Sequence, residues 1–218
     1  MEREEFIKNI KLPVFGDIDG KPLDFTILQE SVMKNFMFTE NFLVLSPRQT
    51  GRATSIFVNL LFELTRPDFK ETILVGHSYN EYEFSRLTEL SDFNKTSVKK
   101  ENLEKLSFRT IGSAYNMSLE ERYGKRIILF DAAFVPDKFL IYKLINGFDT
   151  VIMESVAGRL DSFNSLFIKS LVTNSIKEFS IIKLSYQKLG LSEEWCNRQR
   201  DSLSSPEVFN REVLLEWN

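Results

Sequence analysis

The sequence predicts an α/β fold, in which a mainly parallel central sheet is flanked by helices. Two observations lead to this prediction. Short apolar runs alternate along the chain with longer amphipathic stretches, a pattern typical of strands that are joined by crossover helices. Several runs, such as Phe42–Ser46 and Arg126–Asp131, are apolar at every interior position rather than at every second one. Strands of this kind must be covered on both faces, which is the situation in a parallel sheet.

The order of the elements can be read from the same pattern. Six runs are expected to be strands: Phe42–Ser46, Thr72–Gly76, Phe108–Gly112, Arg126–Asp131, Thr150–Glu154 and Phe179–Leu184. The expected helices are Thr54–Thr65, Tyr79–Leu90, Pro136–Ile145, Asp161–Leu171, Ser192–Ser202 and Ser205–Trp217. The first helix should end before Pro67, because a proline disfavours helical geometry in the residue that precedes it. Ser192 and Ser205 each stand before carboxylates, which is typical of a capped helix start.

Composition excludes several classes of protein. The 218 residues include 28 Lys and Arg against 31 Asp and Glu, and 43% are hydrophobic, which is typical of a folded globular protein. With Cys196 as the one cysteine and His77 as the one histidine, an internal disulfide and multi-histidine metal chemistry lack the residues they need. The first ten residues do not form an export signal, and no apolar run approaches the roughly 20 residues that span a bilayer.

One junction between a strand and a helix carries a chemical pattern. Ligands of open α/β sheets bind at the carboxyl ends of strands, close to helix N-termini. The first such junction reads FLVLS-PRQTGRATS-IF, and its frame Ser46-x4-Gly51-Arg52-Ala53 partly matches the phosphate-binding pattern G-x-x-x-x-G-K-[ST]. The hydroxyl residue is missing at Ala53, although Thr54 offers a hydroxyl one position later. Taken alone, the loop is either a phosphate-binding loop or an ordinary turn between a strand and a helix.

Further segments make this loop part of a longer resemblance. Arg48-Gln49-x-Gly51-Arg52 resembles the R-Q-x-G-K-T variant of the Walker A loop in the large terminase subunits of tailed phages. Four other segments resemble the same family in the same order: the adenine-contacting segment Phe25–Gln29, the Walker B strand Arg126–Pro136, the coupling strand Val151–Gly158 and the closing segment Ser192–Trp217. Each motif is loose, but together they span nearly the whole chain.

The resemblance implies a site for ATP and Mg²⁺ where three strands end. Gln29 would contact the adenine, Arg48 would act as an arginine finger and Asp131 would be the catalytic carboxylate. The other nucleotide-binding residues would be Ser46, Gln49, Thr50, Gly51, Arg52, Ala53 and Thr54. Asp131 and Thr54 would hold the metal ion. The strands expected to lie side by side around this site are Phe42–Ser46, Arg126–Asp131 and Thr150–Glu154.

The resemblance also implies a role and a location. We expect a single ATPase domain over residues 1–218 from a viral DNA-packaging motor, with residues 1–23 as an N-terminal extension and without the family's nuclease domain. The expected partners are double-stranded DNA and the viral portal or other terminase subunits, in a homo- or hetero-oligomeric ring, with no membrane. The expected location is the cytoplasm of the infected host cell, without secretion.

Departures from the family pattern bear directly on activity. Arg52 replaces the lysine, and arginine does not present the same compact ammonium group to phosphates. Ala53 lacks the hydroxyl that would bind Mg²⁺, and one carboxylate of the Walker B pair is missing, since Asp131 stands between Phe130 and Ala132. We therefore expect weak nucleotide binding and slow or absent hydrolysis. The alternatives are an inactive terminase paralogue that acts as a DNA-, portal- or terminase-binding scaffold or regulatory protein, and an unrelated α/β domain.

Overall fold

A computed structural model describes residues 2, 5, 6, 9, 26–38, 41–76, 97–174 and 178–217. Within these residues the chain forms a six-stranded sheet in which all paired strands are parallel. The strands are β1 (Phe42–Leu45), β2 (Thr72–Gly76), β3 (Leu106–Thr110), β4 (Arg126–Leu129), β5 (Thr150–Ser155) and β6 (Ser180–Lys183). The predicted fold class is therefore confirmed. The predicted helix Tyr79–Leu90 and most of the predicted extension over residues 1–23 lie outside the described residues.

The strand order brings the three functional strands of the prediction together. The order is β3-β2-β4-β5-β1-β6, so β4, β5 and β1 are consecutive at the centre of the sheet. Val44 of β1 pairs with Glu154 of β5, and Leu129 of β4 pairs with Met153 of β5. All three strands run in the same direction, so their carboxyl ends meet at one edge of the sheet, as predicted.

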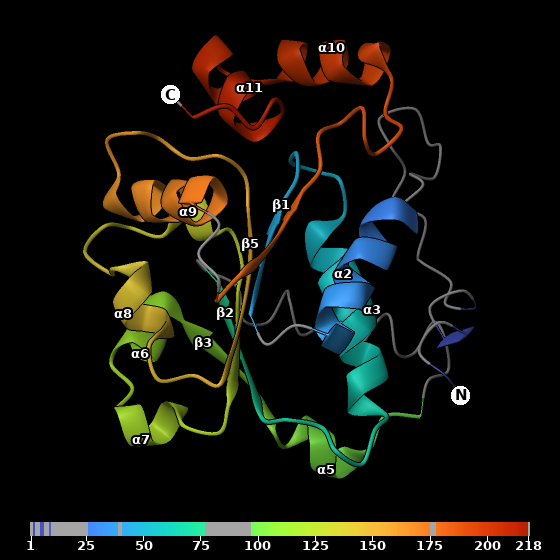
Figure 1. The fold of residues 1–218 in the computed structure, drawn as a ribbon, viewed down its shortest axis with the longest axis vertical. Coiled ribbons are helices and arrows are strands. Elements are labelled where there is room, and N and C mark those ends of the chain that lie inside the picture. The colour runs from blue at the N-terminus through green and yellow to red at the C-terminus, as the bar shows by residue number, and fades with distance from the viewer. Residues whose placement is uncertain are drawn as a thin grey trace.

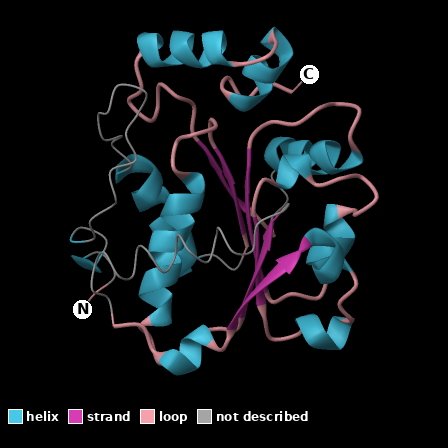
Figure 2. Ribbon diagram, turned by 180° about the vertical axis from the view of Figure 1, so that it is seen from behind, coloured by secondary structure: helices cyan, strands magenta, loops and turns pink. Residues whose placement is uncertain are grey.

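Helices cover both faces of the sheet. Their bounds are α2 (Thr26–Phe38), α3 (Arg52–Leu64), α5 (Lys100–Leu103), α6 (Ile111–Tyr115), α7 (Leu119–Arg122), the 3₁₀ turn η1 (Ala132–Phe134), α8 (Ile141–Ile145), α9 (Phe163–Asn174), α10 (Glu193–Ser202) and α11 (Pro206–Glu212). Figure 1 shows α2 and α3 on one side of the sheet, and α6, α8 and α9 on the other. The helices α10 and α11 lie across one end of the molecule. Figure 2 shows the same three layers from behind.

Two hydrophobic cores explain why the strands are apolar throughout. Val44 and Ile128 are fully buried in the core that contains Phe57 of α3, whereas Leu43 and Leu129 are fully buried in the core on the opposite face. Successive residues of a strand point to opposite faces. Each central strand therefore contributes to both cores, which explains its continuous apolar run.

Most element boundaries lie within a few residues of the prediction. Ser192 and Ser205 cap α10 and α11 as predicted, because each side chain accepts a hydrogen bond from the backbone N–H three residues later. The strand expected at Phe108–Gly112 lies two residues earlier, and α6 begins where that strand was expected to end. The last helix ends at Glu212 and does not reach Trp217.

The helix predicted over Pro136–Ile145 was wrong in its first half, and Asn164 explains why. The side-chain oxygen of Asn164 accepts a hydrogen bond from the N–H of Ile141 at 2.8 Å. Its side-chain nitrogen donates to the carbonyls of Val135 and Phe139, at 3.0 Å each. These contacts hold the segment before Ile141 in a turn that is not helical, so helix α8 begins only there.

Candidate functional site

The loop between β1 and α3, residues 46–51, is tied together by its own hydroxyl groups. The Thr50 hydroxyl donates to the carbonyl of Pro47 at 2.7 Å, and the hydroxyls of Ser46 and Thr50 lie 2.9 Å apart. Since the single proton of Thr50 is used on Pro47, Ser46 is the donor in the second bond. Ser46 and Thr50 are both buried. We call this segment the β1–α3 loop.

Two residues of the β1–α3 loop have left-handed backbone geometry. Gln49 has φ 58° and is exposed, and Gly51 has φ 82° immediately before helix α3. Left-handed geometry strains most residues but not glycine. Ala53 is half-buried against the first core, and Thr54 is buried in the first turn of α3. Gln29 lies on α2, and its side chain falls outside the described part of the structure.

Arg52 is the residue around which the site is built. Its Nη1 atom donates to the backbone carbonyls of Ser46 and Ser155, at 2.6 Å each. Its Nε atom lies 2.5 Å from Oε2 of Glu154, and its Nη2 atom lies 3.5 Å from Oδ1 of Asp131. Only 9% of Arg52 is exposed. The guanidinium thus joins the ends of β1, β4 and β5 from beneath the β1–α3 loop.

The carboxylates beside Arg52 come from two neighbouring strands. Asp131 follows β4, has a left-handed backbone with φ 50° and keeps 52% of its side chain exposed. Glu154 is the fifth residue of β5, and 4% of its side chain is exposed. The backbone N–H of Asp131 donates to Oε1 of Glu154 at 2.9 Å. Together the two residues form an acidic pair at the carboxyl edge of the sheet.

Glu154 is a site residue that the sequence analysis missed. The expected place for the second carboxylate is next to Asp131 in its own strand, at Phe130 or Ala132. Phe130 is instead buried and stacks on Phe57 with ring centroids 5.3 Å apart, so it is part of the core. A charged residue at the end of the apolar run Thr150–Glu154 was the available signal, because a carboxylate at that point must find a partner.

Arg48 is held by the far end of the chain. Its backbone N–H donates to the carbonyl of Glu212 at 2.8 Å, and its Nη1 atom donates to Oε2 of the same glutamate at 2.7 Å. The side chain of Arg48 is 36% exposed and that of Glu212 is 14% exposed. Glu212 ends helix α11, 164 residues away in sequence. This contact was also absent from the sequence analysis.

The charged groups at this edge of the sheet are paired with one another. The guanidinium groups of Arg48 and Arg52 face the carboxylates of Asp131, Glu154 and Glu212. Carboxylates outnumber guanidinium groups, and each guanidinium already contacts at least one carboxylate. A phosphate chain that entered this site would therefore have to compete with acidic groups of the protein itself.

The same arrangement does not fit Mg²⁺. This ion requires a nearly octahedral set of oxygen ligands at about 2.0–2.1 Å. Glu154 directs one oxygen at Arg52 and the other at the N–H of Asp131. A divalent cation beside Asp131 would also be repelled by the guanidinium of Arg52. Over the described residues, no group of three or more His, Cys, Asp or Glu side chains is placed to hold a metal ion.

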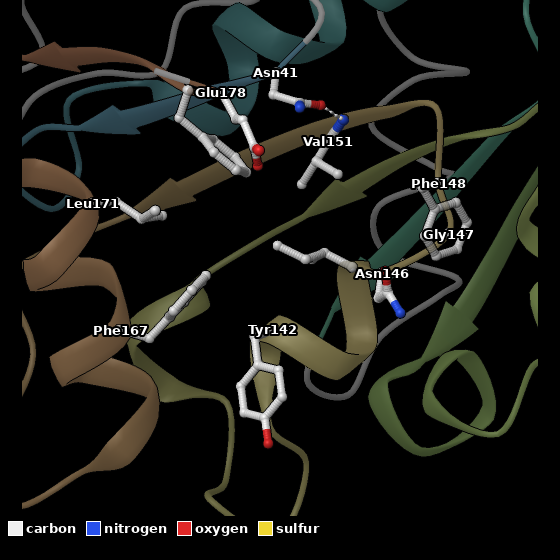
Figure 3. A pocket seen from close by; sticks show the side chains of 11 residues that line it. Asn41, Tyr142, Asn146, Gly147, Phe148, Val151, Phe167, Leu171 and Glu178 are labelled. Carbon is white, nitrogen blue, oxygen red and sulfur yellow. Dashed lines mark hydrogen bonds between the residues drawn. The ribbon is translucent and has the colours of Figure 1, made fainter. Parts of the chain in front are cut away.

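A separate cavity lies at the opposite edge of the sheet (Figure 3). Its volume is about 340 Å³, and it is lined by Asn41, Tyr142, Ile145, Asn146, Gly147, Phe148, Val151, Phe167, Leu171, Glu178 and Phe179. Asn41 and Val151 lie at the amino ends of β1 and β5, joined by a hydrogen bond of 2.6 Å. Open parallel sheets bind ligands at the carboxyl ends of their strands. The cavity contains none of the predicted site residues.

Solved structures share the arrangement of the whole chain. The ATPase domain of the large terminase of Thermus phage P74-26, as an arginine-to-alanine mutant, matches with a TM-score of 0.61 and 15% identity over 98% of this chain and 97% of that one. This chain has the fold of a terminase ATPase domain. The large terminase of a thermophilic bacteriophage, solved in complex with ADP, matches with a TM-score of 0.63 and 10% identity over 87% of this chain and 52% of that one.

The fold of this chain is also similar to that of a phage helicase. The UvsW helicase of bacteriophage T4 matches with a TM-score of 0.52 and 14% identity, over 84% of this chain and 67% of that one. At the level of sequence, no family model and no curated protein matches the chain. In the described part of the chain, no helix has the length and apolar character that crossing a membrane requires.

Proposed function

We propose that this chain is a terminase-like domain of a viral DNA-packaging apparatus that binds its partners without hydrolysing ATP. The observation that carries the proposal is the position of the Arg52 guanidinium, which contacts two backbone carbonyls and two carboxylates of its own chain. This residue stands where the terminase pattern has the lysine that reaches the terminal phosphates. In its place, the protein has a side chain whose hydrogen-bonding capacity is used internally.

The energetics of a buried ion pair support this proposal. Separating a buried charge from its partner costs about 3–5 kcal/mol, because the remaining charge is left without compensation. If Arg52 moved to the phosphates of a nucleotide, Glu154 would lose its partner charge while only 4% of its side chain is exposed. We therefore expect nucleotide binding that is weak and that does not involve Arg52.

The groups needed for hydrolysis are also missing from their places. Phosphoryl transfer depends on positioned charge and metal ions rather than on covalent chemistry. Ala53 offers no hydroxyl to Mg²⁺, and Glu154 is engaged with Arg52 and with the backbone of Asp131. Loss of one positioned electrostatic group typically lowers a rate by about 10²–10³. Several such losses together leave no useful turnover.

A phosphate-release assay with the wild type and two variants tests the proposal. We expect no Mg²⁺-dependent turnover from the wild type, and partial recovery when Arg52→Lys is combined with Ala53→Thr. Phe130 must stay unchanged in the rescue variant, because an aspartate at this buried position would be a charge inside the core. The variant Asp131→Ala is the control for contaminating ATPase, since contaminant activity does not respond to it.

The acidic pair of Asp131 and Glu154 favours a second candidate function, a working ATPase. In that case Glu154 supplies from β5 the carboxylate that β4 lacks, and Arg52 orients both groups. The same assay separates the two functions. Robust wild-type turnover that is abolished by Asp131→Ala would overturn the silent domain in favour of the working ATPase.

We also propose partners for this chain, on the basis of the likeness of its fold to terminase ATPase domains. The chain would bind double-stranded DNA and the portal or other terminase subunits. It would do so in a homo- or hetero-oligomeric ring in the cytoplasm of an infected cell. Titration of the purified protein with labelled duplex DNA tests the first of these partners. Salt dependence of the binding would identify contacts to backbone phosphates, because phosphate contacts release counterions.

A further inference from the structure

The chain returns to the β1–α3 loop after helix α11. Glu212, the last residue of that helix, contacts Arg48 twice, through its backbone carbonyl and through its carboxylate. Figure 1 shows α11 at the end of the molecule toward which the carboxyl end of β1 points. The backbone N–H of a loop residue and a guanidinium are both groups that a phosphate oxygen can accept hydrogen bonds from. Glu212 occupies both of them.

An apolar contact fixes the segment that follows. Leu215 is 2% exposed and packs with Leu45 of β1 and Val156 after β5, with Trp217 half-buried against the same cluster. Leu215 itself has a left-handed backbone, with φ 58°. Residues 212–217, which we call the C-terminal clasp, therefore cover the carboxyl ends of β1 and β5.

The clasp belongs to a unit with a core of its own. Trp195 and Cys196 of α10 pack with Phe209 of α11, Val213 and Tyr186 in a cluster separate from the two sheet cores. This small core does not depend on the contact between Arg48 and Glu212. The clasp can therefore leave the loop while α10 and α11 stay folded against each other.

The two arginines of the site differ in how firmly they are held. Arg52 and Glu154 are both buried, whereas the side chain of Arg48 is 36% exposed. Ion pairs that reach solvent contribute little to stability and are weakened by competing ions. An anion can therefore replace Glu212 at Arg48, although it cannot replace Glu154 at Arg52.

We infer that the C-terminal clasp is an autoinhibitory contact, in which Glu212 takes the place of a phosphate group at Arg48 and is displaced when a polyphosphate binds. The inference rests on the proposed function only in taking a phosphate as the ligand of the loop. Binding of the phosphate and release of the clasp are then one event. Binding of a phosphate to the loop would move Leu215 and Trp217. The surface formed by α10 and α11 would then differ between the bound and the free protein.

Titration with inorganic pyrophosphate tests the inference. The background is Trp195→Phe, which leaves Trp217 as the one tryptophan and therefore as the reporter of the clasp. We expect pyrophosphate to shift the emission of Trp217 to longer wavelength, because that side chain becomes more exposed. Glu212→Ala should bind pyrophosphate about fivefold more tightly, which is the effect of losing one competing partly exposed ion pair.

Two further variants make the result specific. Glu216→Ala removes an exposed carboxylate from the same clasp and should leave the affinity unchanged. Arg48→Ala should abolish the gain that Glu212→Ala produces. Equal affinity of Glu212→Ala and Glu216→Ala, or the absence of pyrophosphate binding in Glu212→Ala, overturns the inference. ATP turnover is measured separately, so a wild type that hydrolyses ATP contradicts the proposed function without affecting the pyrophosphate result.

Discussion

At the scale of single residues, the presence of an arginine rather than a lysine at position 52 determines which contacts are made beside the β1–α3 loop. A lysine ammonium is a point charge at the end of a flexible chain, whereas a guanidinium is a planar group with five N–H donors. The fork geometry lets Arg52 contact Ser46, Ser155 and Glu154 at 2.6, 2.6 and 2.5 Å. The Arg52 guanidinium thus ties the start of the β1–α3 loop to the end of β5.

The first prediction concerns the stability contributed by this cation. Arg52→Met should lower the free energy of unfolding by about 3–5 kcal/mol, because Glu154 would remain buried and uncompensated. Adding Glu154→Leu should restore part of the loss, since the double variant has no buried charge left from the pair. Urea denaturation followed by circular dichroism measures both values.

The matched control for this prediction is an exposed ion pair. Arg66 and Asp68 lie 3.4 Å apart with 47% and 73% of their side chains exposed, so Arg66→Met should change stability by at most about 1 kcal/mol. An Arg52→Met variant that is no less stable than Arg66→Met would contradict the structural role assigned to Arg52.

The sequence identifies both partners of the ion pair between Arg52 and Asp131, but only the arginine of the pairs with Glu154 and Glu212. Arg48, Arg52 and Asp131 stand in recognisable motif positions, so the pattern identified them. Glu154 and Glu212 approach from another strand and from a helix 164 residues away from Arg48. Their positions depend on strand order and on how the last helix packs, and neither property is encoded in local spacing.

At the scale of elements, helix α9 packs closely against Gly158, in the segment that follows β5. A Cβ atom on Gly158 would lie 1.9 Å from Oγ and 2.7 Å from Cβ of Ser165, and 3.3 Å from Cβ of Ala133. Ser165 is in the first turn of α9, and Ala133 is in η1 beside Asp131. Glycine is thus required where these elements meet.

The second prediction follows from this contact. Gly158→Ala should destabilise the protein by about 1–3 kcal/mol, the usual cost of inserting a group into a filled space. Gly76→Ala is the control, because a Cβ atom there meets nothing within 4 Å. Thermal unfolding of the two variants measures the difference. Equal melting temperatures would show that α9 does not pack against Gly158 as described.

The third prediction uses pH to loosen the unit formed by α10 and α11. The Tyr186 hydroxyl donates to Oε1 of Glu193 at 2.7 Å, and this hydrogen bond together with burial raises the pKa of Tyr186 to about 12. Because the folded pKa is raised above the unfolded value of about 10, the stabilisation is complete below pH 10 and disappears as the pH rises toward 12.

The comparison of wild type with Tyr186→Phe isolates this effect from other titrating groups. Between about pH 9 and about pH 11, the wild type should lose more stability than the variant, as measured by urea unfolding midpoints. Parallel losses in the two proteins would mean that the hydrogen bond to Glu193 does not contribute to folding.

Helices and strands are hard to predict from local sequence where distant side chains contact their backbone. Continuous apolar runs and serine caps are local signals, and the strands and the starts of α10 and α11 were predicted from them. The failed first half of the helix at Pro136–Ile145 depends on Asn164, which lies on another helix and takes over the backbone groups that would start it. Such a contact cannot be read from the segment's own sequence.

At the scale of the whole molecule, the parallel sheet determines which segments meet at the carboxyl edge. The order β4-β5-β1 places the β1–α3 loop beside the end of β4 whatever side chains they carry. The backbone frame is kept at 15% identity with the ATPase domain of the Thermus phage terminase. Within that frame, the charge at the carboxyl edge of this chain comes from Arg52 and its carboxylates.

The last prediction is that MgATP does not stabilise the whole wild-type protein against heat. A ligand stabilises the folded state by RT ln(1 + [L]/Kd), so about 1 mM ATP with a Kd above about 1 mM contributes less than about 0.4 kcal/mol. For a chain of 218 residues that free energy corresponds to a rise of at most about 1–2 °C in melting temperature. In the variant that combines Arg52→Lys with Ala53→Thr, a lysine free to reach the phosphates and a hydroxyl for Mg²⁺ should give a shift at least twice as large, measured by differential scanning calorimetry. A wild-type shift of several degrees would mean that Arg52 leaves its carboxylates for the nucleotide, and the domain would then have to be treated as a nucleotide-binding motor.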